Sequence, residues 1–292
     1  MLMKEREHKR ETEKQYKQTL KADPNDVATR LDYGYFLSEM GRLKEAEKQY
    51  KLIFQTDPNN VMAHSDYGLL LYRSGRMKEA EEQFKLALRI NPKNVAAHSN
   101  YGILLETIGR TKEAEEQFKL ALEIDPNDYS AHSNYALFLG ILNRFDEAEK
   151  QFKLALEINP DESTTHLNYG LILYKMGRVE ETEEQYKLAL KNNPRYTAIY
   201  CNYVAILEEK GSMEKAEEQY KLALKIDPKH VPTYLNYASL LEKVGRMNEA
   251  EMQYKLALKA NPNDKEVHYN YGLLLEKMGR LRDAQKHFQR TR

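Results

Sequence analysis

Apolar and small residues recur at intervals of three and four along short stretches of the chain, and residues 95–128 illustrate the pattern. In their first half, this spacing links Ala97, Tyr101, Leu104, Leu105 and Ile108. In their second half, it links Ala114, Phe118, Ala121 and Leu122. Such spacing places side chains on one face of an α-helix. Residues 95–128 are therefore predicted to form two helices, each with one apolar stripe.

The residues around these stripes are of the types that end and begin helices. Gly109 follows the first stripe and can adopt the left-handed conformation that often ends a helix. Pro126 ends the second helix, because a proline disfavours helical conformation in the residue before it. Asn127 or Asp128 can then cap the next helix. Since β-branched residues nowhere alternate with polar ones, strands are not expected and the predicted fold class is all-α.

The same pattern returns every 34 residues along the chain. Eight prolines mark it: Pro24, Pro58, Pro92, Pro126, Pro160, Pro194, Pro228 and Pro262. The full repeats span residues 27–60, 61–94, 95–128, 129–162, 163–196, 197–230 and 231–264. Residues 265–292 form a truncated eighth repeat, and residues 1–26 match only the second half of a repeat, which predicts an N-terminal capping helix. Because one fixed period is typical of repeat arrays, residues 1–292 are interpreted as a single solenoid.

This repeat resembles the tetratricopeptide repeat, whose pattern it matches in the third full repeat at His98, Tyr101, Gly102, Leu105, Ala114, Phe118 and Pro126. The resemblance implies a right-handed superhelical solenoid of antiparallel helix pairs, with the first helices of the repeats lining its concave face. Small residues such as Gly102 and Ala114 are expected to face each other across each pair.

One difference from the family is systematic. The large first aromatic residue of the family pattern is replaced by His64, His98, His132, His166 and His268, and in the other repeats by Arg30, Tyr200 and Tyr234. We interpret the histidines as packing residues. Charged pairs such as Glu115–Glu116 are interpreted as exposed groups on the second helix that pair with lysines one turn away.

The sixth residue of each repeat is the most informative position for function. From the first repeat to the eighth it reads Asp32, Asp66, Asn100, Asn134, Asn168, Asn202, Asn236 and Asn270, a series we call the asparagine file. Asparagine is a poor helix former, so six of them in mid-helix need a reason. An amide side chain can pair with both backbone groups of an extended peptide. The file resembles that of the peptide-binding array in O-linked N-acetylglucosamine transferases and in kinesin light chain, which implies a ladder along the groove.

The alternative interpretation of the file is that each asparagine bonds a neighbouring helix and orders the stack. If the ladder is correct, the peptide site also includes Asp66 and the apolar residues Leu69, Tyr72, Leu137, Leu167, Leu171 and Tyr174. Glutamates gather in the last three repeats at Glu208, Glu209, Glu242, Glu266 and Glu276, with Lys243 and Lys277 beside them. We expect apolar pockets toward the N-terminal end of the groove and a mildly acidic C-terminal end, a solvated face being the alternative for these charges.

Charge and composition narrow the classes of ligand. The chain has 45 Lys and Arg and 45 Asp and Glu, so its net charge is zero, which argues against nucleic acid and anionic membranes as partners. The recurrent histidines do not converge on one point, and no metal site is predicted. The single cysteine, Cys201, excludes a disulfide framework. With no apolar leader and no run of membrane-spanning length, we expect a cytoplasmic location.

No catalytic residue and no cofactor is predicted. The leading interpretation is a non-catalytic scaffold that binds extended peptide segments of other proteins. Two alternatives stay open, namely self-assembly through uncapped ends of the solenoid, and a targeting module of a larger enzyme of which this chain is a fragment.

The Tyr16–Leu20 side of the first helix is expected to pack on the first full repeat. Residues 1–7, which begin with an apolar stretch, are a candidate for docking on a neighbouring molecule.

Overall fold

A computed structural model describes the backbone of residues 2–291 and the side chains of residues 9–291. The described residues form seventeen α-helices and no strand, which confirms the all-α fold class. In chain order the helices are α1 (Leu2–Ala22), α2 (Val27–Glu39), α3 (Leu43–Thr56), α4 (Val61–Arg73), α5 (Met77–Ile90), α6 (Val95–Thr107), α7 (Thr111–Ile124), α8 (Tyr129–Ile141), α9 (Phe145–Ile158), α10 (Ser163–Lys175), α11 (Val179–Asn192), α12 (Thr197–Glu209), α13 (Met213–Ile226), α14 (Val231–Lys243), α15 (Met247–Ala260), α16 (Lys265–Lys277) and α17 (Leu281–Gln289).

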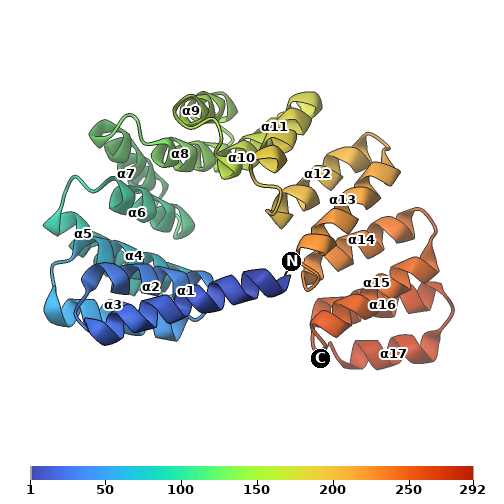
Figure 1. Ribbon diagram of the computed structural model, residues 1–292. Coiled ribbons are helices and arrows are strands. Elements are labelled where there is room, and N and C mark those ends of the chain that lie inside the picture. Colours follow the sequence, from blue (N-terminus) through green and yellow to red (C-terminus); the bar gives the residue numbers. More distant parts are fainter. Residues whose placement is uncertain (1, 292) are drawn as a thin grey trace. The chain divides into compact units, whose positions relative to one another are not determined.

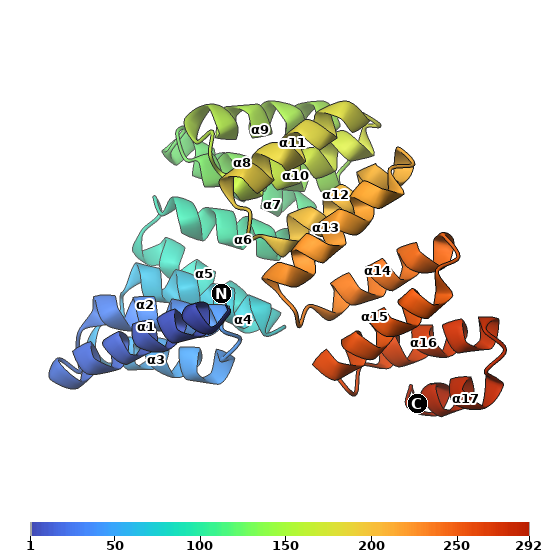
Figure 2. The same ribbon diagram turned by 45° about the vertical axis from the view of Figure 1, so that its right-hand side comes forward.

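Each repeat contributes one closely packed pair of helices, from α2–α3 to α16–α17 (Figure 1). The chain divides into two compact blocks, an N-terminal block of Met1–Pro160 and a C-terminal block of Asp161–Arg292. Within each block, the second helix of one repeat contacts the first helix of the next, as α13 contacts α14 (Figure 2). The single solenoid expected over residues 1–292 stays a prediction.

The helix boundaries follow from the residues at their ends, as the third full repeat shows. α6 begins after Asn94, whose side-chain oxygen accepts a hydrogen bond of 2.7 Å from the backbone N–H three residues later. It ends at Thr107, two residues before Gly109, which has a φ of 79° in the left-handed region that glycine adopts readily. α7 stops before Pro126, and the carboxylate of Asp128 caps α8. In the next repeat Asn143 takes the place of the glycine with a φ of 58°, which asparagine tolerates better than most residues.

The small residue at the eighth position of the repeat makes room for an aromatic ring. A Cβ added at Gly102 would lie 2.9 Å from the ring of Phe118 on the paired helix. The ring of Phe118 therefore fills the space beside Gly102, and the expectation that Gly102 faces Ala114 stays a prediction. The same relation joins Gly34 to Tyr50, Gly68 to Phe84, Gly170 to Tyr186 and Gly272 to Phe288.

Replacing Gly102 with leucine is expected to destabilise the protein by about 1–3 kcal/mol or more, because the new side chain must displace the buried ring of Phe118. Alanine at the same position is the control. Ala136 and Ala238 occupy the equivalent position in other repeats, and the better helix propensity of alanine offsets a small shift of the ring. Urea denaturation of both variants measures the difference, and a leucine variant as stable as the wild type would show that this contact is loose.

The lone helix α1 covers the first full repeat. The ring centroid of Tyr16 lies 5.5 Å from that of Tyr33 and 5.7 Å from that of Phe36, both on α2. These contacts confirm that the Tyr16 side of the helix packs on the first repeat. The expected docking of residues 1–7 falls outside the residues whose side chains the structure describes and stays a prediction.

Candidate functional site

The asparagine file lies on the first helices of the repeats, with one residue on each helix. In the N-terminal block, α4 contacts both α2 and α6, and α6 contacts α8, so successive file residues there sit on neighbouring helices. Asn236 is exposed, and the other asparagines of the file are half-buried. Each asparagine of the file is therefore at least partly accessible from outside the chain.

The hydrogen bonds of the file bear on its two interpretations. Asn100 donates from Nδ2 to Oγ of Ser65 on the preceding first helix, over a long 3.5 Å, which is the type of bond that would order the stack. If this pattern continued, Asn134 would donate to Ser99, but the buried hydroxyl of Ser99 has no partner. In the described part of the chain, no side-chain hydrogen bond is formed by Asn134, Asn168, Asn202, Asn236 or Asn270. These five amides are available to a ligand.

Two residues of the file line one cavity between α14 and α16. The cavity has a volume of about 440 Å³, and its lining includes Asn236, Asn270, Leu235, Ser239, Glu242, Lys243, Tyr254, Glu266, Leu273 and Lys277. The carboxylate of Glu242 accepts hydrogen bonds of 2.8 Å from both Lys277 and Tyr254. Lys243 pairs with Glu208 at 2.6 Å. Lysines thus neutralise part of the acidity expected at this end, and the two amides are polar groups without a partner in the cavity.

At the other end of the file, two aspartates take the place of asparagine. Burial, reinforced by the charge of Asp32 on α2, raises the pKa of Asp66 on α4 to about 6. A protonated carboxyl group both donates and accepts, as an amide does, whereas a carboxylate only accepts. Asp66 therefore offers a ligand the hydrogen-bonding pattern of the other file residues only below about pH 6.

The apolar residues predicted for the site differ in accessibility. Leu167 is only 4% exposed and belongs to the core of the C-terminal block, so it offers a ligand almost no surface. Tyr174 is 38% exposed, whereas Leu69, Tyr72, Leu137 and Leu171 are half-buried. Larger apolar surfaces lie on the same set of first helices at Tyr35, Met62, Ile141 and Tyr269, each more than half exposed. Tyr269 lies directly before Asn270 in the sequence, and this place beside the file could have indicated it as a candidate site residue.

The residues at the fourth position of the repeat share one interaction although they differ in type. The Nε2 atoms of His64, His98, His132 and His268 lie 2.9–3.0 Å from the carbonyl oxygen of the proline six residues earlier. Tyr200 and Tyr234 donate their hydroxyls, and Arg30 a guanidinium N–H, to the equivalent carbonyl. The histidines are buried, as expected of packing residues, and these hydrogen bonds also fasten the first helix to the preceding loop.

Replacing His98 with phenylalanine is expected to cost about 1–3 kcal/mol of stability, because the carbonyl of Pro92 and the amide of Gln117 lose a buried partner. Tyrosine is the control, since tyrosine reaches the same carbonyl in two other repeats, and it should cost less than about 1 kcal/mol. Chemical denaturation compares the two variants. Equal stabilities would mean that the bond to the proline carbonyl contributes nothing.

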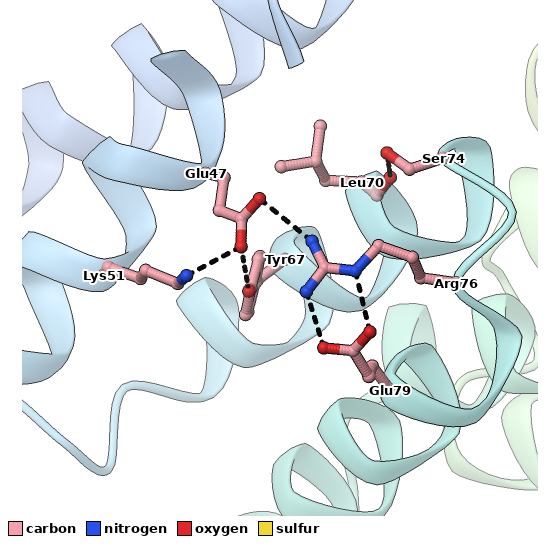
Figure 3. Close-up of polar contacts among 7 residues, drawn as sticks. All are labelled: Glu47, Lys51, Tyr67, Leu70, Ser74, Arg76 and Glu79. Atoms are coloured by element: carbon pink, nitrogen blue, oxygen red, sulfur yellow. Dashed lines mark hydrogen bonds and ion pairs between the residues drawn. The ribbon is translucent and has the colours of Figure 1, made fainter. Parts of the chain in front are cut away.

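A charged junction between successive repeats was not predicted from the sequence (Figure 3). Glu47 on α3 accepts hydrogen bonds from the Tyr67 hydroxyl, at 2.8 Å, and from Arg76, at 2.9 Å, both in the next repeat. It also pairs with Lys51 one turn along its own helix, at 2.8 Å. Arg76 in addition contacts Glu79 through two nitrogens.

The same junction recurs along both blocks around carboxylates that we call the junction glutamates: Glu13, Glu47, Glu81, Glu115, Glu183, Glu217 and Glu251. At Glu115 the expected pair with Lys119 is present at 2.9 Å. Its side chain is only 22% exposed, however, and it also binds Tyr135 and Arg144 of the next repeat. The constant spacing of Glu and Tyr, followed by Arg in every one of these junctions except that of Glu183, where Lys210 takes its place, was the signal in the sequence that could have revealed this role.

Three further observations concern metal binding, membrane crossing and the reactivity of the cysteine. Among the side chains that the structure describes, no three His, Cys, Asp or Glu gather as metal ligands would. Within residues 2–291, every helix is too short or too polar to cross a membrane. Cys201 is half-buried with its Sγ 3.4 Å from Oγ1 of Thr233, and burial raises the pKa of its thiol, which makes it a poor nucleophile.

Comparisons with known proteins agree with this architecture. Family models described as tetratricopeptide repeat match residues 37–95 and 141–196, residues 71–136, residues 197–230 and 231–264, and residues 254–286. Together these matches reach across residues 37–136 and 141–286. The comparison with curated proteins finds no match.

Solved structures with similar folds include proteins of different kinds. Yeast Tom70 aligns with a TM-score of 0.71 at 18% identity, over 92% of this chain and 60% of its own. The human IFIT1 dimer with m7Gppp-AAAA aligns with a TM-score of 0.64 at 16% identity, over 96% and 76%. PilF of Pseudomonas aeruginosa aligns with a TM-score of 0.59 at 20% identity, over 74% and 97%. The TM-scores show that these proteins share a fold with this chain. At such low identities the fold does not indicate the ligand, which has to be argued from the residues of this chain.

Proposed function

Because the chain belongs to the tetratricopeptide repeat family, we propose that it is a non-catalytic scaffold that binds extended segments of other proteins along the first helices of its repeats. The amides of the asparagine file pair with the backbone of the bound segment, and the apolar side chains beside them receive its side chains. The resemblance of the file to that in O-linked N-acetylglucosamine transferases supports this assignment.

The observation that supports the proposal most is the set of five file amides without a partner in the chain. An extended backbone exposes an N–H and a C=O at every residue except proline, and one asparagine amide can satisfy both. The cavity of about 440 Å³ beside Asn236 and Asn270 falls within the size range of small binding sites. The amides recognise the backbone of a ligand, and any preference for its sequence comes from the apolar contacts.

The charge of the site fits a polypeptide better than a nucleic acid. The chain is neutral overall, and the lysines at the α14–α16 cavity are paired with glutamates. Nucleic-acid sites instead place unpaired cations along a backbone of phosphates. We assign another protein as the partner and the cytoplasm as the location, where the free thiol of Cys201 stays reduced.

Selection from a library of random peptides displayed on phage tests this function. We expect enriched peptides to bind the purified chain and to shift the side-chain amide NMR signals of Asn202, Asn236 and Asn270. Methylation of backbone nitrogens in a selected peptide should weaken binding by roughly two- to tenfold per bond lost, because it removes the N–H that donates to the amide oxygen. Selected peptides that leave the file signals unmoved, or that tolerate methylation throughout, would contradict backbone recognition by the file.

Light scattering on the same sample without peptide separates this function from self-assembly. A scaffold for other proteins keeps one molar mass as its concentration rises. A mass that grows with concentration would favour the self-assembling solenoid instead.

A further inference from the structure

In the part of the chain that the structure describes, the pair α16–α17 differs from the other repeats in the residue that faces its fourth-position histidine. His268 is 1% exposed, and its Nδ1 lies 2.8 Å from Nδ1 of His287 on α17. Its Nε2 lies 3.0 Å from the carbonyl oxygen of Pro262. In four other repeats the facing residue is a glutamine, at Gln83, Gln117, Gln151 and Gln185.

The positions of the protons decide how many protons this histidine pair can hold while keeping its hydrogen bond. The carbonyl of Pro262 only accepts, so Nε2 of His268 carries a hydrogen and donates it. When both rings are neutral, Nδ1 of His268 accepts the N–H of His287. One added proton is also accommodated, because a cationic ring donates to its neutral partner. A second added proton sets two N–H groups and two positive charges face to face across 2.8 Å, and the hydrogen bond is lost.

Glutamine avoids this conflict in the other repeats. Its amide can turn either its oxygen or its NH2 group toward the ring. Neutral His98 can therefore accept from Gln117, and cationic His98 can donate to it, with the hydrogen bond kept in both states. The substitution of histidine for glutamine removes this freedom from α16–α17.

The groups that face His287 do not compensate for the repulsion between two protonated rings. The nearby charged and titratable groups are Asp283, Lys286 and Arg290 from its own end of the chain, and His268 and Tyr271 from α16. Only Asp283 among these favours the cationic ring. Glu251 on α15 is occupied, since it accepts from Tyr271 and Arg280. Burial, followed by the charge of His268, lowers the pKa of His287 below its usual value of 6.5.

We propose that α16–α17 is a proton-sensitive helix pair, in which uptake of a second proton by His268 and His287 releases α17 from α16. Release uncovers Tyr271, whose ring centroid lies 4.3 Å from that of His287, and the site at Gly272 where the ring of Phe288 packs. The state in which α17 is packed on α16 disfavours the second proton, so the state in which α17 is released binds this proton at a higher pH. Packing of α17 is thus fully retained above about pH 6.5 and weakens as the pH falls below that value.

Hydrogen exchange of the full chain as a function of pH tests this. After correction for the intrinsic pH dependence of exchange, the opening constant of α17 should rise by roughly tenfold between about pH 7.5 and pH 5.5, because one extra proton changes it up to tenfold per pH unit below the pKa of the open state. Protection of α15 should change much less and serves as the internal reference.

Two variants make the test specific. His287→Gln restores the residue of the other repeats, so it should fold and should lose the pH dependence of α17. Gln117→His installs the pair beside His98 in the third full repeat and should create a pH dependence of comparable size at α7. Exchange of α17 that is equal at both pH values, or that keeps its pH dependence in His287→Gln, would overturn the proposal.

Discussion

Replacing Asn202, Asn236 and Asn270 together with alanine is expected to raise the Kd of a selected peptide by about 30- to 1000-fold. Each amide makes two neutral hydrogen bonds to the ligand, and at about 0.5 kcal/mol net per bond, the low end of the usual range, three amides contribute about 3 kcal/mol, which lies within the range of about 2–4 kcal/mol that this change in Kd represents. Any single substitution should change the Kd by only about tenfold or less. Folding should survive, because alanine is the better helix former and none of the three amides has a hydrogen bond within the described chain.

Calorimetric titration and thermal melting of the same preparation measure both expectations. Asn248→Ala is the control, since it makes the same chemical change at an exposed position on the second helix α15 and should leave the Kd unchanged. Unfolding of the triple variant would show that the file orders the helix stack. A folded variant that binds with the wild-type Kd would move the binding role to the apolar residues Leu137, Leu171 and Tyr174.

The helices could be predicted from the sequence because each boundary is a local event. Gly109 ends a helix through its own φ, and Asp128 begins one through a single hydrogen bond to the backbone. Neither needs knowledge of the neighbouring repeat. Repetition adds certainty, since every repeat presents the same signals at the same positions.

Contacts between helices were harder to predict, because they depend on which side chains the packing brings together. The sequence indicated that small residues such as Gly102 let the paired helices approach, but it did not indicate that the ring of Phe118 lies against this glycine. Leu167 lies at a position expected to face the groove and is nevertheless buried. Such outcomes follow from the tilt and separation of helices, which periodicity along one chain leaves undefined.

The junction glutamates also were not identified from the sequence, because their role depends on contacts between repeats. Glu115 and Glu116 look alike in the sequence, since each belongs to a charged stretch of a second helix. The structure buries most of the Glu115 side chain against Tyr135 and Arg144 of the next repeat and leaves Glu116 exposed. Only the stacking of one repeat on another distinguishes the structural carboxylate from the solvated one.

These junctions predict acid unfolding. At Glu47 burial alone would raise the pKa, but hydrogen bonds from Lys51, Tyr67 and Arg76 outweigh it and hold the pKa at about 2. The pKa is also about 2 at Glu13, Glu81, Glu183, Glu217 and Glu251. A carboxylate whose pKa falls on folding stabilises the folded state above its unfolded pKa, near 4.5, and loses that contribution as the pH falls toward 2.

With about 1–3 kcal/mol at stake in each junction, the melting temperature should fall steeply between about pH 4.5 and pH 2, and the helical circular dichroism signal should be lost cooperatively within each block. Glu115→Gln isolates one junction, because the neutral amide keeps the shape but gives up the charge. It should lower stability at pH 7 by about 1–2 kcal/mol and make the loss in acid shallower. Glu116→Gln is the matched control, one residue away and exposed, and should change neither. If both variants follow the wild-type pH profile at wild-type stability, the carboxylate of Glu115 does not hold its two repeats together.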